Sequence, residues 1–465
     1  MRIAVAVLDK RGRNATSVIA EALGKVTAGS ETPGFLATPA ETAESPTALG
    51  TVSTSQNDRL QPQQLEGAVV VFDGRIYRPT QKGTNSDFAT QKMRELIKWA
   101  EALVKNVDGD FVVLAAQPDR IVAARGSVGV QPLYYGQTTR LVALASNRRT
   151  LWRLGIEEPK SFPPGNVAVA TWKGFKFKSV KVLEFCEPKP IPMADAAAKL
   201  QKLLEQSVKV RVAGEKRVAV AFSGGLDSSI VACLAKSCGV EVELIHVSLV
   251  GQSETEEAQR AAEALELPMQ IHLFTEVDVE NVAPKVVELV EEADPVKAAV
   301  GIPFFWNAQK AAKAGLRVML AGQGADELFG GYQRYVTEYI AKGDEAVRKT
   351  MFQDVAVIHE TNVERDEKIC GYHDVELRIP FGAFKVAEFA MSLPTTLKFE
   401  CRADSLRKLV LRRVAENLGL PKEIANKPKR AVQYSTGINN ALKRIAKGNG
   451  LTLSEYVEGL FLESK

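Results

Sequence analysis

Short apolar or alternating runs, separated by Gly, Asn, Asp and Pro, dominate the first 186 residues of this 465-residue chain. Alternation of apolar and polar positions is typical of half-buried strands, and the residues between the runs favour turns. One helical pattern lies at residues 87–105, and residues 28–58, rich in Ser, Thr, Pro and Gly, predict a long loop. The expected strands are residues 3–8, 67–72, 110–116, 141–146 and 166–172.

The pattern changes after a proline-rich segment, residues 187–194. Strand-like runs then alternate with helical patterns, which predicts a parallel sheet with helices on both faces, and the chain from Tyr332 onward reads as mainly helical. The expected strands are residues 217–222, 241–247, 269–274 and 317–320. We therefore predict a mainly β domain over residues 1–186, a linker over residues 187–194 and an α/β domain over residues 195–465.

Composition narrows the class of protein. The chain is 45% apolar and carries a net charge of +4, which is modest for its length and does not indicate nucleic-acid binding. No apolar run predicts a membrane span, and the first residues lack the pattern of a signal peptide. The five cysteines form no Cys-x-x-Cys pair and fit reduced thiols. We expect a cytoplasmic enzyme.

A glycine-rich turn with hydroxyls lies between an expected strand and an expected helix, at residues 223–229 (SGGLDSS). Such a turn presents free backbone N–H groups and the positive end of a helix dipole to an anion. Asp227 would repel a bare phosphate, so its presence indicates a bridging Mg²⁺. A tight turn with a capping serine is the alternative. The residues predicted to bind the pyrophosphate part of ATP are Ser223, Gly224, Gly225, Asp227, Ser228 and Ser229.

A second glycine-rich block, residues 320–332 (LAGQGADELFGGY), sharpens this interpretation. The first block resembles the pyrophosphate loop of ATP pyrophosphatases, which split ATP between its α- and β-phosphates. Together the two blocks resemble the synthetase domain of the asparagine synthetase family, which includes β-lactam synthetases. The resemblance implies a doubly wound sheet of the adenine nucleotide α-hydrolase type, with the ligand at the carboxyl ends of its strands.

An acidic segment, residues 290–295 (VEEADP), resembles the Glu-x-x-Asp segment of that family. The resemblance implies that Asp294 joins Asp227 in binding Mg²⁺ and that Glu291 assists proton transfer near the reacting carboxylate. A solvated acidic face at a helix end is the alternative. Lys297 lies where the aspartate enzymes of the family carry an arginine, so either Lys297 binds the substrate or the substrate differs.

The remaining nucleotide and substrate contacts follow from the same resemblance. Gly322 and Gly324 would let the backbone approach the nucleotide and the acyl group. Asp326 and Glu327 are predicted to bind substrate, with capping of the next helix as the alternative. Leu249 and Val250 are expected to form the adenine wall. Residues 253–257 (SETEE) read as a capped helix start, to which we assign a structural role.

Two basic segments lie toward the C-terminus. Residues 427–437 (KPKRAVQYSTG) would suggest nucleic acid if taken alone. The family resemblance implies instead a segment that closes over the site, with Lys429 and Arg430 as catalytic cations on the departing pyrophosphate. The other set, at helical spacing, predicts a solvated face: Arg402, Arg407, Lys408, Arg412 and Arg413.

The first domain resembles the glutaminase domain of the same family, an N-terminal-nucleophile (Ntn) hydrolase fold of αββα type. The matching segments are residues 71–77, 125–136 and 163–165. The departures concern the chemistry. Arg2 replaces the nucleophilic cysteine, Asp73 replaces an oxyanion-binding asparagine, and Arg75 replaces a glutamate that binds the glutamine amine; Asp87 alone remains of that pair. We predict that this domain does not hydrolyse glutamine.

These observations predict an ATP-dependent, AMP-forming ligase. The reaction that the family resemblance implies first is the conversion of aspartate to asparagine through β-aspartyl-AMP. With the glutaminase residues replaced, we expect ammonia rather than glutamine as the nitrogen donor. Adenylation of another carboxylate or of an RNA base, and a non-catalytic homologue, stay open as alternatives. The expected partners are small molecules, namely ATP, aspartate or a similar carboxylate, and ammonia. The oligomeric state is open, a homodimer being one alternative.

Overall fold

The chain folds into two compact units, Met1–Val182 and Leu183–Lys465. The structure, a computed structural model, describes residues 2–27, 34–39, 45–53, 61–65, 67–78, 96–400, 402, 406–427 and 436–465. Each unit has hydrophobic clusters of its own.

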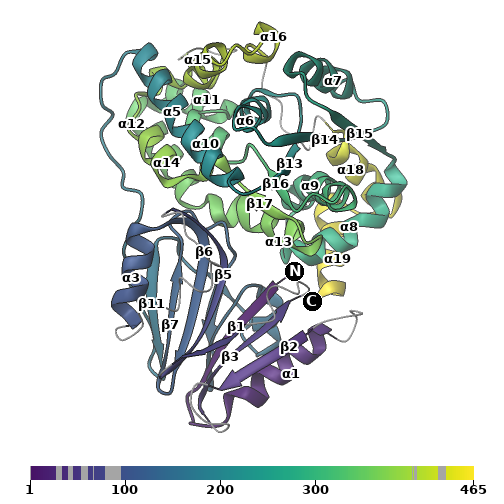
Figure 1. Cartoon of the computed structure of the whole chain (residues 1–465). Helices are drawn as coiled ribbons and strands as arrows, with labels where there is room; N and C mark the ends of the chain where they lie inside the picture. Colours follow the sequence, from purple (N-terminus) through teal and green to yellow (C-terminus); the bar gives the residue numbers. More distant parts are fainter. Residues whose placement is uncertain are drawn as a thin grey trace. The chain divides into compact units, whose positions relative to one another are not determined.

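The first unit is built on two six-stranded antiparallel sheets, ordered β10-β8-β9-β1-β3-β2 and β12-β11-β7-β6-β5-β4 over the described residues. Ala4 and Leu8 of β1 pack with Val112 and Leu114 of β6, so the two sheets stack face to face. Helix α1 covers the outer face of the first sheet, and α3 covers the outer face of the second (Figure 1). This layering confirms the αββα expectation.

The bounds of these elements are β1 Arg2–Asp9, α1 Ala15–Thr27, β2 Gly34–Pro39, β3 Thr47–Ser53, β4 Gln63–Leu65, β5 Ala68–Arg78, α3 Leu96–Asn106, β6 Asp108–Gln117, β7 Arg120–Arg125, β8 Tyr134–Gln137, β9 Leu141–Ala145, α4 Arg148–Arg153, β10 Lys160–Ser161, β11 Asn166–Thr171 and β12 Gly174–Ser179.

The long loop predicted over residues 28–58 is wrong for most of the described part of that stretch, which forms β2 and β3. Strand β3 pairs with β1 from Thr47 to Ser53 and also pairs with β2. The composition misled because pairing between two partners, with Leu49 and Val52 buried, outweighs the local preference of Ser, Thr and Gly for turns. The helix expected over residues 87–105 appears as α3 from Leu96, and residues 87–95 lie outside the described part.

The second unit is built on a five-stranded parallel sheet, ordered β15-β14-β13-β16-β17. Strand β13 lies at its centre. The chain adds β14 and β15 on one side of β13 and then returns to place β16 on the other side. The switch point of the sheet is therefore between β13 and β16, where ligands of doubly wound sheets bind. The alternation of strands and helices predicted this sheet, except for β17, which is too short to show a period.

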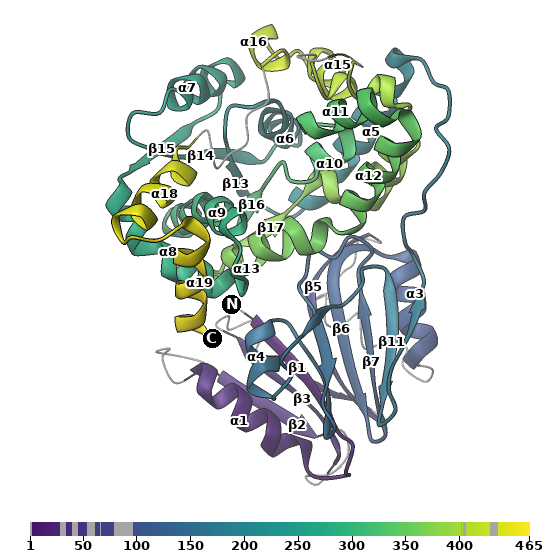
Figure 2. The ribbon, with the colours of Figure 1, turned by 180° about the vertical axis from the view of Figure 1, so that it is seen from behind.

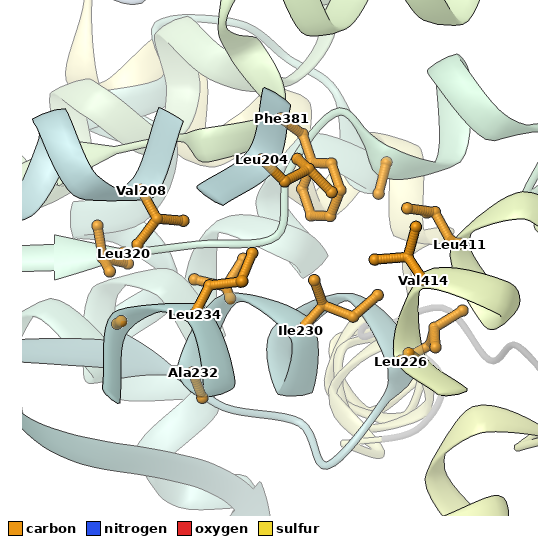
Figure 3. Close-up of a cluster of buried hydrophobic side chains, with 14 of the residues drawn as sticks. Leu204, Val208, Leu226, Ile230, Ala232, Leu234, Leu320, Phe381, Leu411 and Val414 are labelled. Carbon is orange, nitrogen blue, oxygen red and sulfur yellow. The ribbon is translucent and has the colours of Figure 1, made fainter. Parts of the chain in front are cut away.

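Helices cover both faces of this sheet. Val218 and Val220 of β13 pack in one cluster with Leu204 and Val208 of α5 and with Ile230 of α6 (Figure 3). Helix α9 contacts β13, β14 and β16 but contributes nothing to that cluster, so it covers the opposite face. The C-terminal helices α18 and α19 pack against α8 and α9 (Figure 2).

The bounds of these elements are α5 Met193–Val212, β13 Arg217–Ala221, α6 Leu226–Ser237, β14 Glu241–Leu249, α7 Glu254–Leu265, β15 Met269–Phe274, α8 Glu276–Val290, α9 Pro295–Lys313, β16 Val318–Leu320, α10 Ala325–Phe329, α11 Gln333–Lys342, α12 Asp344–Ala356, the π-helix η2 His359–Val363, α13 Glu364–Tyr372, β17 Glu376–Arg378, η3 Pro380–Gly382, α14 Phe384–Met391, η4 Thr395–Leu397, α15 Leu409–Asn417, α16 Lys422–Ala425, α18 Ile438–Gly448 and α19 Leu453–Ser464.

Candidate active site

The turn between β13 and α6 has the geometry expected of an anion-binding loop. Gly225 is the N-cap of α6, and no side chain caps the helix there. Ser223 Oγ accepts from the Gly225 N–H at 3.3 Å and lies 3.2 Å from Ser228 Oγ. The Ser229 hydroxyl is buried and has no hydrogen-bond partner among the described residues. Hydroxyls and a helix N-terminus thus converge on one small volume.

The second glycine block lies directly against this loop. A Cβ built on Gly322, just beyond the end of β16, would lie 2.9 Å from Asp227 Cβ, so only glycine fits at that position without displacement. Strands β13 and β16 are neighbours, with Val220 opposite Leu320. The structure therefore brings the two glycine-rich blocks together at the switch point of the sheet.

A buried lysine joins the two blocks electrostatically. Lys408 Nζ lies 2.6 Å from Asp227 Oδ2 and 2.7 Å from Asp326 Oδ1, and the lysine is 2% exposed. Lys408 precedes α15 in the left-handed backbone region, at φ 61°. The two carboxylates supply the negative charge that a buried ammonium requires.

This observation corrects the sequence interpretation of the basic residues before and within α15. Arg402 and Arg413 are exposed as predicted, but Lys408 and Arg412 are buried. Arg412 donates to the carbonyl oxygens of Ala425 and Lys427 and so holds the chain that leads into the basic segment. Helical spacing predicted a solvated face for two reasons that fail here. Lys408 lies before the first residue of α15, and tertiary contacts supply partners for Lys408 and Arg412 in the interior.

The environment of Asp227 fits a divalent cation. Its Oδ1 atom is buried and has no hydrogen-bond donor among the described residues, while Oδ2 is paired with Lys408. Mg²⁺ prefers one or two carboxylates together with phosphate oxygens and water. Among the described residues, no group of three or more His, Cys, Asp or Glu side chains is arranged to hold a metal ion. A cation here would therefore need oxygens from the nucleotide.

Asp294 occupies a different local setting. It is the N-cap of α9, and its side chain accepts from the backbone N–H groups of Val296 at 2.7 Å and Lys297 at 3.0 Å. One carboxylate oxygen is thus used to cap the helix. The contacts found do not link Asp294 to Asp227.

Glu291 is buried in a strained position. It caps the C-terminus of α8 with φ 60° and accepts from Lys368 Nζ at 3.1 Å. Non-glycine residues in this region are uncommon and concentrate at functional sites. Lys297 Nζ is also engaged, with Glu292 at 2.5 Å and with the carbonyl oxygen of Glu360 at 2.8 Å.

Glu327 belongs to a buried polar group beside Asp326. It accepts from the Tyr332 hydroxyl at 2.7 Å and from the Asn362 amide at 2.9 Å, and Asn362 lies in the π-helix η2. Burial, with the neighbouring Asp326 carboxylate, raises the pKa of Glu327. Gly324, the N-cap of α10, has a left-handed φ of 89°.

The segment predicted to contact adenine follows β14. Leu249 is buried, and its N–H donates to the carbonyl oxygen of Thr436 at 3.1 Å, whereas the Val250 side chain is exposed. Leu249 therefore contacts Thr436, which belongs to the basic segment of residues 427–437. Lys429 and Arg430 lie outside the described residues.

Lys427, at the start of the basic segment, contacts the pyrophosphate loop. Its Nζ donates to the carbonyl oxygen of Gly224 at 3.3 Å and pairs with Glu257 of α7 at 2.9 Å. Sequence reasoning favoured Lys429 and Arg430 over this lysine. Lys427 could have been selected because it belongs to the same basic segment. Nothing in the sequence indicates a role for Lys408 in the site.

The first unit places the departures from the glutaminase pattern on β1 and β5. Arg2 begins β1, and Asp73 and Arg75 lie half-buried on β5. Arg125, in contrast, is fully buried and donates to the carbonyl oxygens of Phe162 and Gly129. The matching residues thus support the fold, while the departures fall on the expected catalytic positions. Asp87 lies outside the described residues.

Comparison with known proteins agrees with both units. The family model for asparagine synthase matches residues 199–345 and 337–461, and that for a glutamine amidotransferase domain matches residues 52–153. No described helix is long and apolar enough to cross a membrane.

Two relatives illustrate the similarity. A protein of Methanocaldococcus jannaschii that is named a putative glutamine-hydrolysing asparagine synthetase is 31% identical over 456 residues, covering 86% of this chain and 84% of the relative. The asparagine synthetase of Sandersonia aurantiaca is 27% identical over 84% of this chain and 78% of its own. Among solved structures, a glutamine phosphoribosylpyrophosphate amidotransferase from B. subtilis is 14% identical with a TM-score of 0.31, covering 58% of this chain and 65% of its own, a distant likeness. The chain belongs to the asparagine synthase family of ATP-dependent carbon–nitrogen ligases.

Proposed function

We propose that this protein is an ammonia-dependent asparagine synthetase, which converts aspartate to asparagine through β-aspartyl-AMP and releases AMP and pyrophosphate. The observation that carries this proposal is the group formed by Asp227, Lys408 and Asp326 at the carboxyl ends of β13 and β16. A second observation supports the ammonia dependence: in the first unit, Arg2, Asp73 and Arg75 replace the residues of glutamine hydrolysis.

In the first half-reaction, the substrate carboxylate attacks the α-phosphorus of ATP and pyrophosphate leaves. The loop of residues 223–229 would hold the β- and γ-phosphates through its backbone N–H groups and serine hydroxyls. Lys408 would neutralise negative charge that grows on the leaving pyrophosphate. Asp227 would hold Mg²⁺ through its unpartnered oxygen, with Asp294 as a second candidate; when bound, the ion supplies charge neutralisation at the phosphates.

In the second half-reaction, ammonia attacks the acyl carbon and AMP leaves. The amine must lose protons as the new C–N bond forms, and Glu291 is the proposed acceptor. Its carboxylate is held by Lys368 Nζ at 3.1 Å, which fixes its position. Asp326, Glu327 and Gly324 would line the acyl side of the site.

The nitrogen source follows from the first unit. A thiolate nucleophile is needed for the family's glutamine hydrolysis, and the described first unit has no cysteine; the complete sequence has none before Cys186. A carboxylate at Asp73 cannot donate to an oxyanion and would repel it. Free ammonia is therefore the proposed donor.

The second candidate function is adenylation of a carboxylate other than aspartate, and the contacts of Lys297 support it. Its ammonium is only slightly exposed and is engaged by Glu292 and Glu360, so it is not available to a substrate carboxylate in this arrangement. If aspartate is the substrate, another cation must bind its α-carboxylate.

The test is a turnover assay with Mg-ATP, aspartate and either ammonium or glutamine, in which AMP, pyrophosphate and asparagine are measured. We expect asparagine and AMP in equal amounts with ammonium, and no product with glutamine. Pyrophosphate release that depends on another carboxylate and not on aspartate would support the second candidate. Asparagine formation from glutamine, with glutamate, would contradict the proposed donor.

A further inference from the structure

Helix α7, to which we assigned only a structural role from the sequence, is linked to the pyrophosphate loop and the residue before it through Thr255, Glu257 and Ala258. We propose that His246 and Thr255 form a positioning pair, which ties the start of α7 to the pyrophosphate loop and so sets the shape of that loop for ATP. The inference rests on the proposed nucleotide role of the loop.

The hydrogen bonds of His246 define the pair. The imidazole is buried on β14, with Nδ1 3.0 Å from the carbonyl oxygen of Phe222 and Nε2 3.3 Å from Thr255 Oγ1. A carbonyl oxygen only accepts, so Nδ1 carries the proton and Nε2 accepts from the threonine hydroxyl. Burial, with Lys427 nearby, lowers the pKa of His246 and keeps it in this neutral form at pH 7.

Two further contacts fix the same helix to the loop. A Cβ built on Gly224, whose φ is 65°, would lie 2.6 Å from the Cα atom of Ala258, so the loop backbone packs directly on α7. Lys427 bridges the Gly224 carbonyl oxygen and the Glu257 carboxylate. The loop therefore has α7 as its supporting wall on this side.

The position of α7 in the chain explains why the His246–Thr255 pair should affect ATP binding. Helix α7 begins at Glu254, directly after the segment around Leu249 and Val250 that is proposed to contact adenine. His246 lies on the strand that leads into that segment. A nucleotide that engages the adenine wall and the loop together thus meets two surfaces joined by the His246–Thr255 hydrogen bond, and loss of that bond should weaken ATP binding.

The test compares Thr255→Val, which removes the hydroxyl, with Thr255→Ser, which keeps it. We expect Thr255→Val to raise the KM for ATP about tenfold, the upper range for the loss of one part-buried hydrogen bond, with a smaller change in kcat. Thr255→Ser should restore the wild-type KM. Gln259→Ala on the same helix is the control and should change neither parameter. A kcat loss without a KM change, or no rescue by serine, would overturn the proposal.

A double-mutant cycle adds a second readout. His246→Asn keeps a donor near the Nδ1 position but removes the acceptor for Thr255, so the double variant His246→Asn/Thr255→Val should bind ATP no more weakly than the poorer single variant. Additive effects would overturn the pair. Calorimetric Kd values for Mg-ATP separate this inference from the proposed reaction: a wild type without turnover contradicts the reaction, while equal Kd values in wild type and Thr255→Val contradict the pair.

Discussion

The two units of this chain differ in the charged residues at their predicted catalytic positions. In the second unit, Lys408 lies between Asp227 and Asp326, so each charge has a partner and the group lies at the switch point of the sheet. In the first unit, Asp73 and Arg75 stand on β5 where the family resemblance places an uncharged donor and a carboxylate. The layers of the first unit are nevertheless complete, with Leu114 and Val142 buried between its sheets.

The difference teaches that the fold and the chemistry of a domain depend on different residues. Burial of apolar side chains and buried contacts such as those of Arg125 stabilise the first unit without any need for a nucleophile. The second unit keeps buried charges that would be unfavourable without their partners. The following predictions test that contrast, in order of decreasing effect.

The largest effect is expected for Asp227→Ala. The variant removes the carboxylate whose Oδ1 is free to bind a cation, and it leaves Lys408 with one partner. We expect ATP-dependent pyrophosphate release to fall about 1,000-fold, because charge neutralisation at the phosphates is lost. The control is Asp119→Ala, an exposed aspartate of the first unit, which should retain full activity. Unchanged pyrophosphate release in Asp227→Ala would contradict the assignment of the loop.

Lys408→Met should show that a buried ion pair of the second unit contributes more to the free energy of unfolding than an exposed ion pair of the first unit. Removal of this ammonium takes away the cation that lies between the largely buried carboxylates of Asp227 and Asp326, and we expect the free energy of unfolding to fall by about 3–5 kcal/mol. The matched control is Lys178→Met in the first unit, where the exposed pair with Glu101 should contribute less than about 1 kcal/mol. Urea unfolding of both variants measures the difference. Equal losses in the two variants would mean that Lys408 is not a buried counter-ion.

A smaller, pH-dependent effect is expected at Lys398. This lysine is 4% exposed, and burial lowers the pKa of its ammonium to about 7. Between pH 7 and the normal lysine pKa the unfolded chain binds a proton that the folded chain does not. Stability should therefore rise with pH in that window.

Lys398→Met should flatten this dependence and raise the thermal midpoint at pH 7 by several degrees. Thermal unfolding of wild type and variant at pH 6, 7, 8 and 9 measures both effects. The pH dependence of Lys398→Met should match that of the wild type only if the ammonium keeps an ordinary pKa, and that result would refute the prediction.

The smallest effect is expected for Arg2→Cys. The variant supplies a thiol at position 2, but Asp73 would still repel an oxyanion and Arg75 would still repel the glutamine amine. We expect no glutamate release from glutamine and unchanged ammonia-dependent turnover. Measurable glutaminase activity would show that the cysteine alone was missing.

The sequence predicted much of the candidate site because its motifs are local. Strand, glycine turn and helix follow one another within residues 217–237, so an anion-binding turn could be predicted from the order of the residues. The resemblance to ATP pyrophosphatases supplied its proposed role in pyrophosphate binding. Gly322 could be assigned to the same site because the carboxyl ends of parallel strands share one edge of a sheet. Asp294 shows the limit, because a carboxylate before Pro295 fits both a metal ligand and a helix cap, and its observed contacts are those of a cap.

Residues far apart in the chain could not be assigned in this way. Lys408 is 181 residues from Asp227, and in the sequence it looks like one more cation of an amphipathic helix. His246 and Thr255 lie in segments that read as a strand and a capped helix, and only the packing of α7 on Gly224 gives them a connection to the loop. Strand β3 was missed for a similar reason, because its pairing with β1 and β2 outweighs its turn-like composition.

The sequence by itself determined the mainly β character of the first unit, the parallel sheet with helices on both faces of the second unit and the glycine-rich loop, because a linear chain displays periodicity and residue types at short spacing directly. Its resemblance to the asparagine synthetase family added the αββα class and the predicted loss of the glutaminase residues. Only the tertiary structure decided which charges are buried and which partners they have. The reason is physical: the state of an ionisable group depends on its burial and on opposite charges within a few ångströms, and folding brings those charges from distant parts of the chain.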